Sequence, residues 1–86
     1  MYVILVYDVA EERVGKMPRI LRKYLKHVQR SVFEGNITTS NLEMMKKELL
    51  KVMDISEDSV RLYILRSENA FHSEVIGVNT LSSNIL

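Results

Sequence analysis

Few residues in this sequence have types and spacing that could do chemistry: one carboxylate, Asp8, and one block of basic side chains. Asp8 ends an apolar run at the N-terminus, MYVILVYD. The end of a strand is a common place for a functional group, so Asp8 is a candidate. A structural interpretation is also open, because Asp8 and Glu11 are spaced like a local helix cap. No second carboxylate follows at a spacing that would complete a metal site within the chain.

The basic block lies between positions 13 and 30 and contains no Asp or Glu. The formal net charge of only +1 conceals this block, since the acidic residues lie elsewhere. An unmixed basic stretch is typical of a surface that binds a phosphate backbone without reading sequence, although charged helix faces also serve solubility alone. The block consists of Arg13, Lys16, Arg19, Arg22, Lys23, Lys26 and Arg30.

Several other chemistries are disfavoured. The chain has no cysteine, which excludes disulfides, thiol nucleophiles and cysteine-ligated metals, and fits a reducing, cytoplasmic compartment. His27 and His72 lie on different elements, so a histidine pair is unsupported. The hydroxyl residues near Ser31 lack an adjacent histidine and acid. The N-terminal apolar run is too short to span a membrane.

Two helices are expected to carry or flank these residues. Apolar residues at steps of three and four predict a helix from about residue 16 to residue 28, with the basic block on its outer face. Pro18 is tolerated there because it falls in the first turn. A second helix is predicted from Ser40 to about Asp54, since Ser40 and Glu43 form a capping box.

Four strands complete the predicted elements. The continuous apolar run over residues 2–7 predicts a central strand buried on both faces. Residues 29–37 predict a strand that bends at Gly35, and residues 59–66 and 70–78 predict a hairpin. The elements together predict an α+β sandwich with both helices on one face of the sheet and a second copy of the chain covering the other.

The short length supports self-association. A chain of 86 residues buries only about 60% of its unfolded surface on folding, so a monomer would be marginally stable. We expect one domain over residues 1–78 and a short tail over residues 79–86, which could add an edge strand in a dimer. Candidate apolar contacts of that dimer are Val75, Ile76, Val78, Leu81, Ile85 and Leu86.

Three segments together resemble the CRISPR-associated Cas2 family. They are the strand YVILVYDV from Tyr2, the run VQRSVFEG from Val28 and the run DSVRLYIL from Asp58. The resemblance covers nearly the whole chain. It departs from the family at His27, where an arginine is frequent, and at Leu25, where a glycine is usual. A ferredoxin-like fold also needs two short strands around residues 29–37, separated near Ser31 or at Gly35.

The resemblance implies a fold and an activity. Family members are ferredoxin-like homodimers, with an antiparallel sheet, two helices on one face and the dimer packed through the sheets. Several are metal-dependent endonucleases on RNA or DNA. In this chain Asp8 matches the metal-associated, catalytic aspartate, with Mg²⁺ or alternatively Mn²⁺ as cofactor. Phe33 matches the motif phenylalanine and Arg13 a helix-start arginine, while Tyr7 and Ser31 belong to the matching motifs.

The resemblance also implies partners. The family's dimers act as adaptors that hold double-stranded DNA between pairs of the CRISPR integrase Cas1 during spacer integration, and single-stranded RNA is a second nucleic-acid partner. In a symmetric dimer two Asp8 side chains could flank one Mg²⁺, which accepts one or two carboxylates. The alternative is a stand-alone toxin-type endoribonuclease of similar fold. No membrane partner is expected.

Overall fold

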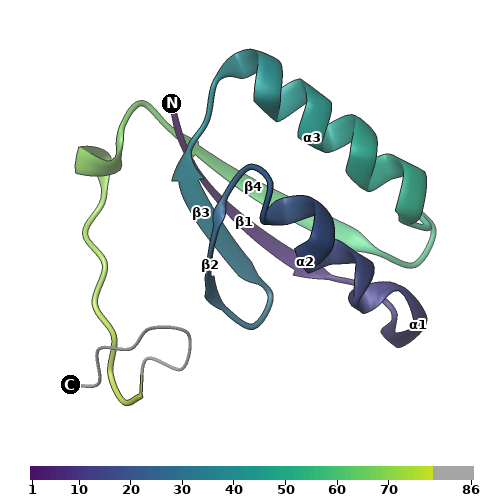
Figure 1. The fold of residues 1–86 in the computed structure, drawn as a ribbon. Helices are drawn as coiled ribbons and strands as arrows, with labels where there is room; N and C mark the ends of the chain where they lie inside the picture. Colours follow the sequence, from purple (N-terminus) through teal and green to yellow (C-terminus); the bar gives the residue numbers. More distant parts are fainter. Residues whose placement is uncertain (79–86) are drawn as a thin grey trace.

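Four antiparallel strands form one sheet, and the helices lie against one of its faces (Figure 1). The structure is a computed structural model and describes residues 1–78. The strand order is β2-β3-β1-β4, and a 3₁₀ turn, η1, follows the last strand. The elements are β1 Tyr2–Asp8, α1 Glu11–Val14, α2 Lys16–Leu21, β2 Lys26–Gln29, β3 Val32–Asn36, α3 Thr39–Val52, β4 Ser59–Leu65 and η1 Glu68–Ala70.

This order of elements confirms the predicted fold class. The chain alternates as strand, helical segment, two strands, helix and strand, which is the ferredoxin-like α+β arrangement. In the part of the chain from residue 1 to residue 78, no helix combines the length and the apolar character that a membrane span requires.

The central position predicted for β1 is confirmed, but its burial on both faces is not. Val3, Leu5 and Tyr7 point toward the helices and are buried. Between them, Ile4 is half-buried and Val6 is 37% exposed, because the helices cover only one side of the sheet. No helix of the described residues packs on the other side, which is here called the open face.

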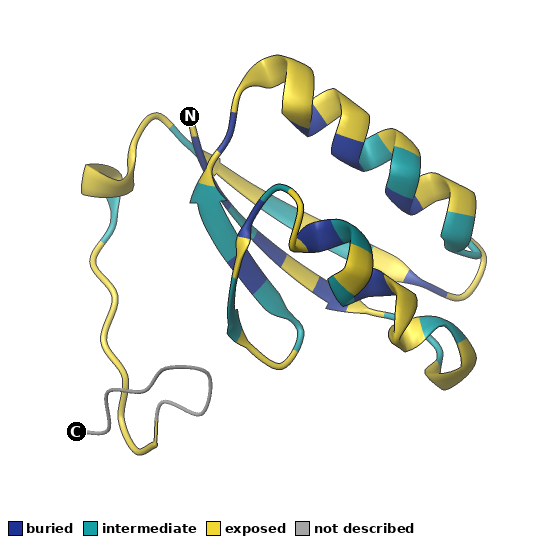
Figure 2. Ribbon diagram, viewed as in Figure 1, coloured by how far each residue is buried: buried dark blue, intermediate teal, exposed yellow. Residues whose placement is uncertain are grey.

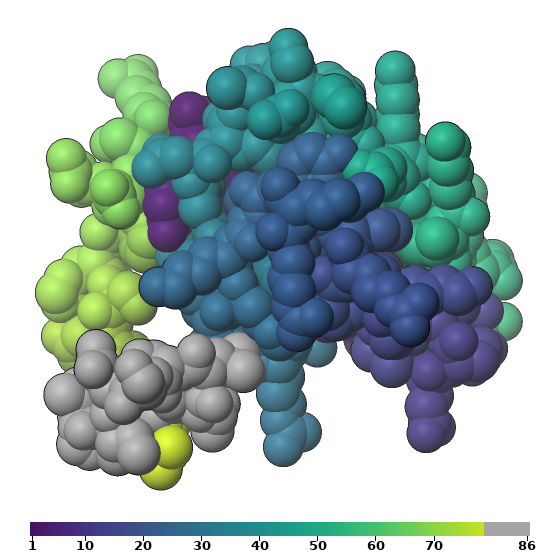
Figure 3. Space-filling view, viewed as in Figure 1, coloured from purple at the N-terminus to yellow at the C-terminus, as the bar shows by residue number. Residues whose placement is uncertain are grey.

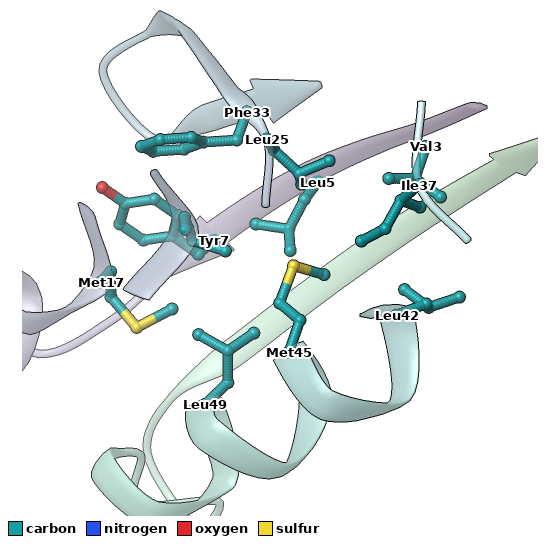
Figure 4. Close-up of a cluster of buried hydrophobic side chains, with 11 residues drawn as sticks. Val3, Leu5, Tyr7, Met17, Leu25, Phe33, Ile37, Leu42, Met45 and Leu49 are labelled. Atoms are coloured by element: carbon teal, nitrogen blue, oxygen red, sulfur yellow. The ribbon is translucent and has the colours of Figure 1, made fainter. Parts of the chain in front are cut away.

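The core lies between the covered face and two helices. Leu42, Met45 and Leu49 of α3 recur at steps of three and four and point into the core. Figure 4 shows the Met45 side chain directed toward Leu5, with the Tyr7 and Phe33 rings close by. Figure 2 shows the buried residues of α2 and α3 on the sides facing the sheet. Seen from the helix side, α2, α3 and the turn after α2 form a continuous layer of side chains (Figure 3).

The start of α3 differs by two residues from the prediction. Thr38, not Ser40, is the N-cap, and its hydroxyl accepts a hydrogen bond from the Asn41 amide at 3.1 Å. Both Ser and Thr are favoured N-cap residues, Ser somewhat more. Thr38 takes the position because the helical backbone already begins at Thr39, which leaves Ser40 inside the first turn.

The predicted helix over residues 16–28 is too long. Helix α2 ends at Leu21, and the chain turns through residues 22–25 before it enters β2. Val28 fits the helical spacing only by coincidence, since Lys26 and His27 pair with Glu34 and Phe33 of β3. Strand pairing and the stacking of His27 on Phe33, with ring centroids 4.2 Å apart, outweigh the weak helical preference.

The single strand predicted over residues 29–37 is two strands, β2 and β3. They are separated at Arg30 and Ser31, which form the tight turn between them. The break near Ser31 therefore supplies the two short strands of the ferredoxin-like order, and Gly35 lies within β3.

The hairpin predicted for residues 59–66 and 70–78 is wrong. Strand β4 forms, but η1 then carries the chain away from its edge, and the segment beyond η1 forms no strand up to residue 78. The Phe71 ring packs on Tyr2, with centroids 5.2 Å apart, so this segment lies over the open face near β1. The predicted tail over residues 79–86 lies outside the described residues.

Candidate nucleic-acid and metal site

Asp8 is exposed at the end of β1, on the open-face side of the sheet. Asp8 lies two residues after Val6 and four after Ile4, so its side chain points to the same face as theirs, opposite the buried Tyr7. Its backbone pairs with Ser59 of β4. Within residues 1–78 its carboxylate has no hydrogen-bond partner, and the residue before α1, Ala10, has no side-chain cap. The capping interpretation of Asp8 therefore finds no support in this structure.

The β2–β3 turn lies beside the end of β1. The Tyr7 amide donates to the Ser31 carbonyl at 3.0 Å, and the Tyr7 hydroxyl donates to the Arg30 carbonyl at 3.4 Å. The same carbonyl lies 2.8 Å from Nε2 of His27. Burial raises the pKa of Tyr7, which keeps this hydroxyl a donor. Tyr7 thus holds the turn that contains Ser31, and Phe33 packs beside it against His27.

Arg13 is bound by acidic residues from a distant segment, in what we call the Asp58 cluster: Asp58, Arg13, and the amides of Ala10 and Asp54. Nε of Arg13 donates to Oδ2 of Asp58 at 2.7 Å, and Nη2 donates to Oδ1 at 3.0 Å. Nη2 also contacts Glu57 at 3.2 Å. The Arg13 side chain is 18% exposed and the Asp58 side chain 0% exposed. The sequence suggested that Arg13 is available to bind phosphate, but in the structure its guanidinium is paired with Asp58.

The pKa values of this pair reflect the contact. Hydrogen bonds from the Arg13 guanidinium hold the pKa of Asp58 well below its usual range, against the opposing effect of burial. The backbone amides of Ala10 and Asp54 lower it further. The same bonds raise the pKa of Arg13. Both groups are charged at any physiological pH.

A second basic residue, Lys23, is also paired. Its ammonium group contacts Glu48 of α3, which accepts a hydrogen bond from Tyr24 as well. The contact with Lys23 lowers the pKa of Glu48. This group joins the turn after α2 to α3. The block itself contains no acidic residue, but the fold brings Asp58 and Glu48 to two of its seven members.

The other five basic residues form no ion pair within residues 1–78, and all are exposed; we call them the free cations. They lie on neighbouring elements, since α2 packs against β2. They do not share one helix face as predicted: Lys26 lies in β2 beside Glu34, and Arg30 lies in the β2–β3 turn. The free cations are Lys16, Arg19, Arg22, Lys26 and Arg30.

The centre of the open face carries apolar side chains, with Glu34 of β3 beside Ile4 and Arg61 of β4 beside Val6. Ile4 and Val32 are half-buried, Val6 is 37% exposed and Tyr63 is 49% exposed. Tyr2 donates a hydrogen bond to Glu34 at 2.7 Å, and burial together with this bond raises the pKa of Tyr2 to about 12. The segment after η1 closes one side of a hollow of about 510 Å³ between Ile4, β2 and Phe71.

At the end of β1, the described part of the chain presents one candidate metal donor, the Asp8 carboxylate. Within residues 1–78 no three metal-ligating side chains come together. Asp8 by itself fits Mg²⁺, because this ion takes one or two carboxylates and completes its octahedron with water and phosphate oxygens. The same donor set suits Mn²⁺. Two Asp8 carboxylates from two chains would suit either ion better.

Asp58 is the functional candidate that the sequence did not reveal. In the sequence it is only one of the scattered acidic residues and the first residue of the third family-like segment. Its pairing with Arg13 spans 45 residues, so no local spacing could indicate it. The sequence offered one indirect signal: Arg13 has no Asp or Glu three or four residues away that could pair with it.

The fold and the site define a class: a ferredoxin-like α+β protein with one open sheet face, an exposed carboxylate at the end of its central strand and a cation-rich flank. The family model for "CRISPR associated protein Cas2" matches residues 1–72, and the chain belongs to this family. The resemblance stated from the sequence is thereby confirmed.

Individual relatives agree with this assignment. The chain is 50% identical over 78 residues to a "CRISPR-associated endoribonuclease Cas2" of Thermotoga maritima, covering 91% of this chain and 90% of the relative. It is 46% identical over 86 residues to a "CRISPR-associated endoribonuclease Cas2 3" of Thermodesulfovibrio yellowstonii, covering 99% and 98%. A solved structure titled "Crystal structure of cas2" superposes with a TM-score of 0.88 at 36% identity, covering 100% and 97%.

Proposed function

We propose that this chain is a CRISPR-associated endonuclease that cleaves phosphodiester bonds of RNA or DNA through Asp8 and a bound Mg²⁺ or Mn²⁺. The observation that carries the proposal is the placement of Asp8: exposed, without a partner in residues 1–78, and fixed at the end of the central strand. The names of the relatives, which are endoribonucleases, support the reaction class. Family membership favours this proposal over a toxin-type ribonuclease.

The working unit in this proposal is a homodimer packed through the open faces. Ile4, Val6 and Tyr63 are apolar side chains that the chain's own helices leave uncovered. Because Asp8 lies on the same face as Ile4 and Val6, a two-fold axis that passes near the end of β1 at this face would bring the two Asp8 carboxylates together. Apolar residues of the last described segment, Val75, Ile76 and Val78, would gain cover from the second copy.

Different residues of the chain would bind the metal, bind the phosphates and position the β2–β3 turn. Asp8 would hold the metal, which supplies an activated water and charge stabilisation at the scissile phosphate. The free cations would hold the flanking phosphates and position the strand. The Tyr7 and His27 side chains would keep the β2–β3 turn, and with it Arg30, beside the end of β1.

The test is cleavage by the purified Asp8→Asn variant. We expect Mg²⁺-dependent cleavage of single-stranded RNA and of duplex DNA to fall to the level of a protein-free control, while the melting temperature stays unchanged. Glu11→Gln, three residues away and also exposed, is the matched control and should retain activity. Unchanged cleavage by Asp8→Asn would refute the proposal.

A second function, as an adaptor for double-stranded DNA, is favoured by the free cations. The five free cations form a larger basic surface than a metal site with one aspartate requires. Here the dimer would hold DNA while the integrase Cas1 does the chemistry. Light scattering should give twice the chain mass of 10.0 kDa for the protein alone, and a larger complex with a duplex and Cas1. A monomer that gains no mass with either would refute the adaptor.

A further inference from the structure

The Asp58 carboxylate accepts four hydrogen bonds and is fully shielded from solvent. Two come from Arg13, at 2.7 and 3.0 Å. The other two come from backbone amides, Ala10 to Oδ1 at 2.9 Å and Asp54 to Oδ2 at 2.9 Å. Four donors nearly exhaust the lone-pair positions of a carboxylate, so its orientation is fixed. This is a more complete set of bonds than a surface ion pair makes.

These bonds fasten the segment that follows Asp8. Ala10 lies two residues after Asp8 and donates its amide to Asp58. Asp8 itself pairs with Ser59, the residue directly after Asp58. The backbone around Asp8 is therefore held on one side by β4 pairing and, two residues later, by the Asp58 side chain.

The segment that presents Asp58 is itself ordered by local bonds. The Asp58 amide donates to the Asp54 carbonyl at 2.7 Å, and the Glu57 amide donates to the same carbonyl at 3.0 Å. The Asp54 side chain accepts from the amide and the hydroxyl of Ser56. The turn between α3 and β4 is thus held by bonds from its backbone and from the Asp54 side chain.

Arg13 gives the cluster a second connection to the same region. Helix α1 has only four residues and no side-chain cap, so it has little stability of its own. The planar guanidinium contacts both oxygens of Asp58, which fixes the direction in which α1 leaves Ala10. Without this contact, the backbone after Asp8 would keep the β4 pairing and the Ala10 bond to Asp58, but α1 would lose its side-chain link to the residue that precedes β4.

We propose that Asp58 and Arg13 are positioning residues for Asp8: they fix the backbone on its C-terminal side and thereby the direction of a carboxylate that has no side-chain partner of its own within residues 1–78. This inference rests on the proposed function of Asp8. It assigns Arg13 to positioning in place of the phosphate contact expected from its charge. A ligand displaced by a fraction of an ångström binds a hard cation less well, since Mg²⁺ demands near-ideal geometry.

The experiment compares metal binding and cleavage in the full chain. Binding of Mn²⁺ is followed by paramagnetic broadening of the Asp8 amide resonance, and the half-saturating Mg²⁺ concentration is measured for cleavage of single-stranded RNA. In Asp58→Asn, an amide NH₂ group replaces one carboxylate oxygen and faces the N–H donors of Arg13, Ala10 and Asp54. We expect the metal affinity to fall by roughly 10-fold to 100-fold, which is the range found when a group that orients a metal ligand is lost. Arg13→Lys keeps the charge but cannot make the two-point contact, so a smaller fall is expected.

Two control variants separate positioning from general destabilisation. Glu57→Gln removes the exposed negative charge beside Arg13 and leaves the bonds of Asp58 intact, so its Mn²⁺ affinity should equal that of the wild type. Leu42→Ala truncates a core side chain of α3, an element that does not carry Asp8. It should lower the melting temperature without changing the metal affinity.

The outcomes are distinct. Weaker metal binding in Asp58→Asn and Arg13→Lys, with both controls at the wild-type value, supports the inference. Wild-type affinity in a folded Asp58→Asn, or an equal loss in Leu42→Ala, overturns it. If Asp58→Asn does not fold, Arg13→Lys decides in the same way. An Asp8→Asn variant that binds Mn²⁺ like the wild type refutes the proposed function itself, which is a separate result.

Discussion

Arg13 and Arg22 belong to the same basic block of the sequence but lie in opposite surroundings. Arg13 is 18% exposed and is bound by Asp58, Glu57 and Glu12. Arg22 is exposed and forms no ion pair within residues 1–78. The first charge is used to hold the fold together, and the second remains available to a ligand. Density of charge along a sequence therefore does not tell which cations can bind nucleic acid.

The strongest test of this comparison removes the Asp58 carboxylate. In Asp58→Ala the Arg13 guanidinium and two amides lose their acceptor, and we expect the melting temperature to fall by roughly 15 °C or more, as for the loss of one partner of a buried pair in a small domain. Thermal unfolding followed by circular dichroism measures the change. Glu57→Ala, which removes the exposed acid next to it, is the control and should change little. A melting temperature near that of the wild type would show that the Asp58 cluster is not a structural region.

The next test reverses three free cations. Changing Lys16, Arg19 and Arg22 to Glu should weaken duplex binding about 100-fold at physiological salt and reduce the log–log salt slope by about 0.9 for each phosphate that the variant no longer neutralises. Stability should stay nearly unchanged, because these side chains form no ion pair within residues 1–78. Fluorescence anisotropy over a range of salt concentrations measures both the affinity and the slope.

The control for this test is an equal change of charge on another surface. Changing Lys47, Lys51 and Arg66 to Glu alters the net charge by the same amount, on α3 and after β4. If that variant loses as much affinity as the first, binding depends on net charge alone. The distinction between a binding surface and the remaining surface would then be wrong.

A third test uses pH. The pKa of Asp58 is lowered in the folded state, so its contribution to stability is fully present above the unfolded value of about 3.9 and is lost as pH falls from there through the folded value. The free energy of unfolding in urea should thus decrease below about pH 4. In Arg13→Lys, which weakens the bonds that lower this pKa, the decrease should be shallower. Identical acid profiles for the two proteins would contradict the assignment.

The smallest expected effect comes from converting a paired cation into a free one. Glu48→Gln removes the negative charge beside Lys23, so duplex affinity should rise about twofold to threefold. The melting temperature should fall slightly, because Tyr24 and Lys23 lose a charged acceptor. Glu43→Gln on the same helix is the control, since its partner Lys46 lies outside the basic block. A weaker or unchanged affinity in Glu48→Gln would show that Lys23 contributes nothing to binding.

The fold was predictable where local patterns agree with tertiary packing. The apolar run of β1, the alternation of β4 and the apolar spacing of α3 all specify their elements. The predicted helix over residues 16–28 failed because Val28 satisfies a helical spacing while pairing at the edge of the sheet places its neighbours in β2. The predicted strand over residues 70–78 failed because Phe71 packs on Tyr2.

The site was less predictable than the fold. Asp8 stands out because a charge ends an apolar run, which is a local signal. The partners of Arg13 and Lys23 come from residues 45 and 25 positions away, and only the folded chain brings them together. Sequence reasoning therefore located the candidate carboxylate but overestimated the number of uncommitted cations.

The position of β1 at the centre of the sheet has a consequence during synthesis. The neighbours of β1, strands β3 and β4, are synthesised after it. The Ala10 amide can bond to Asp58 only after 48 more residues have been made. At ordinary translation rates this delay is roughly 2 to 10 s. A ribosome-bound chain thus exposes its most apolar strand before any partner exists, and the end of β1 acquires its final shape only after β4 has left the ribosome.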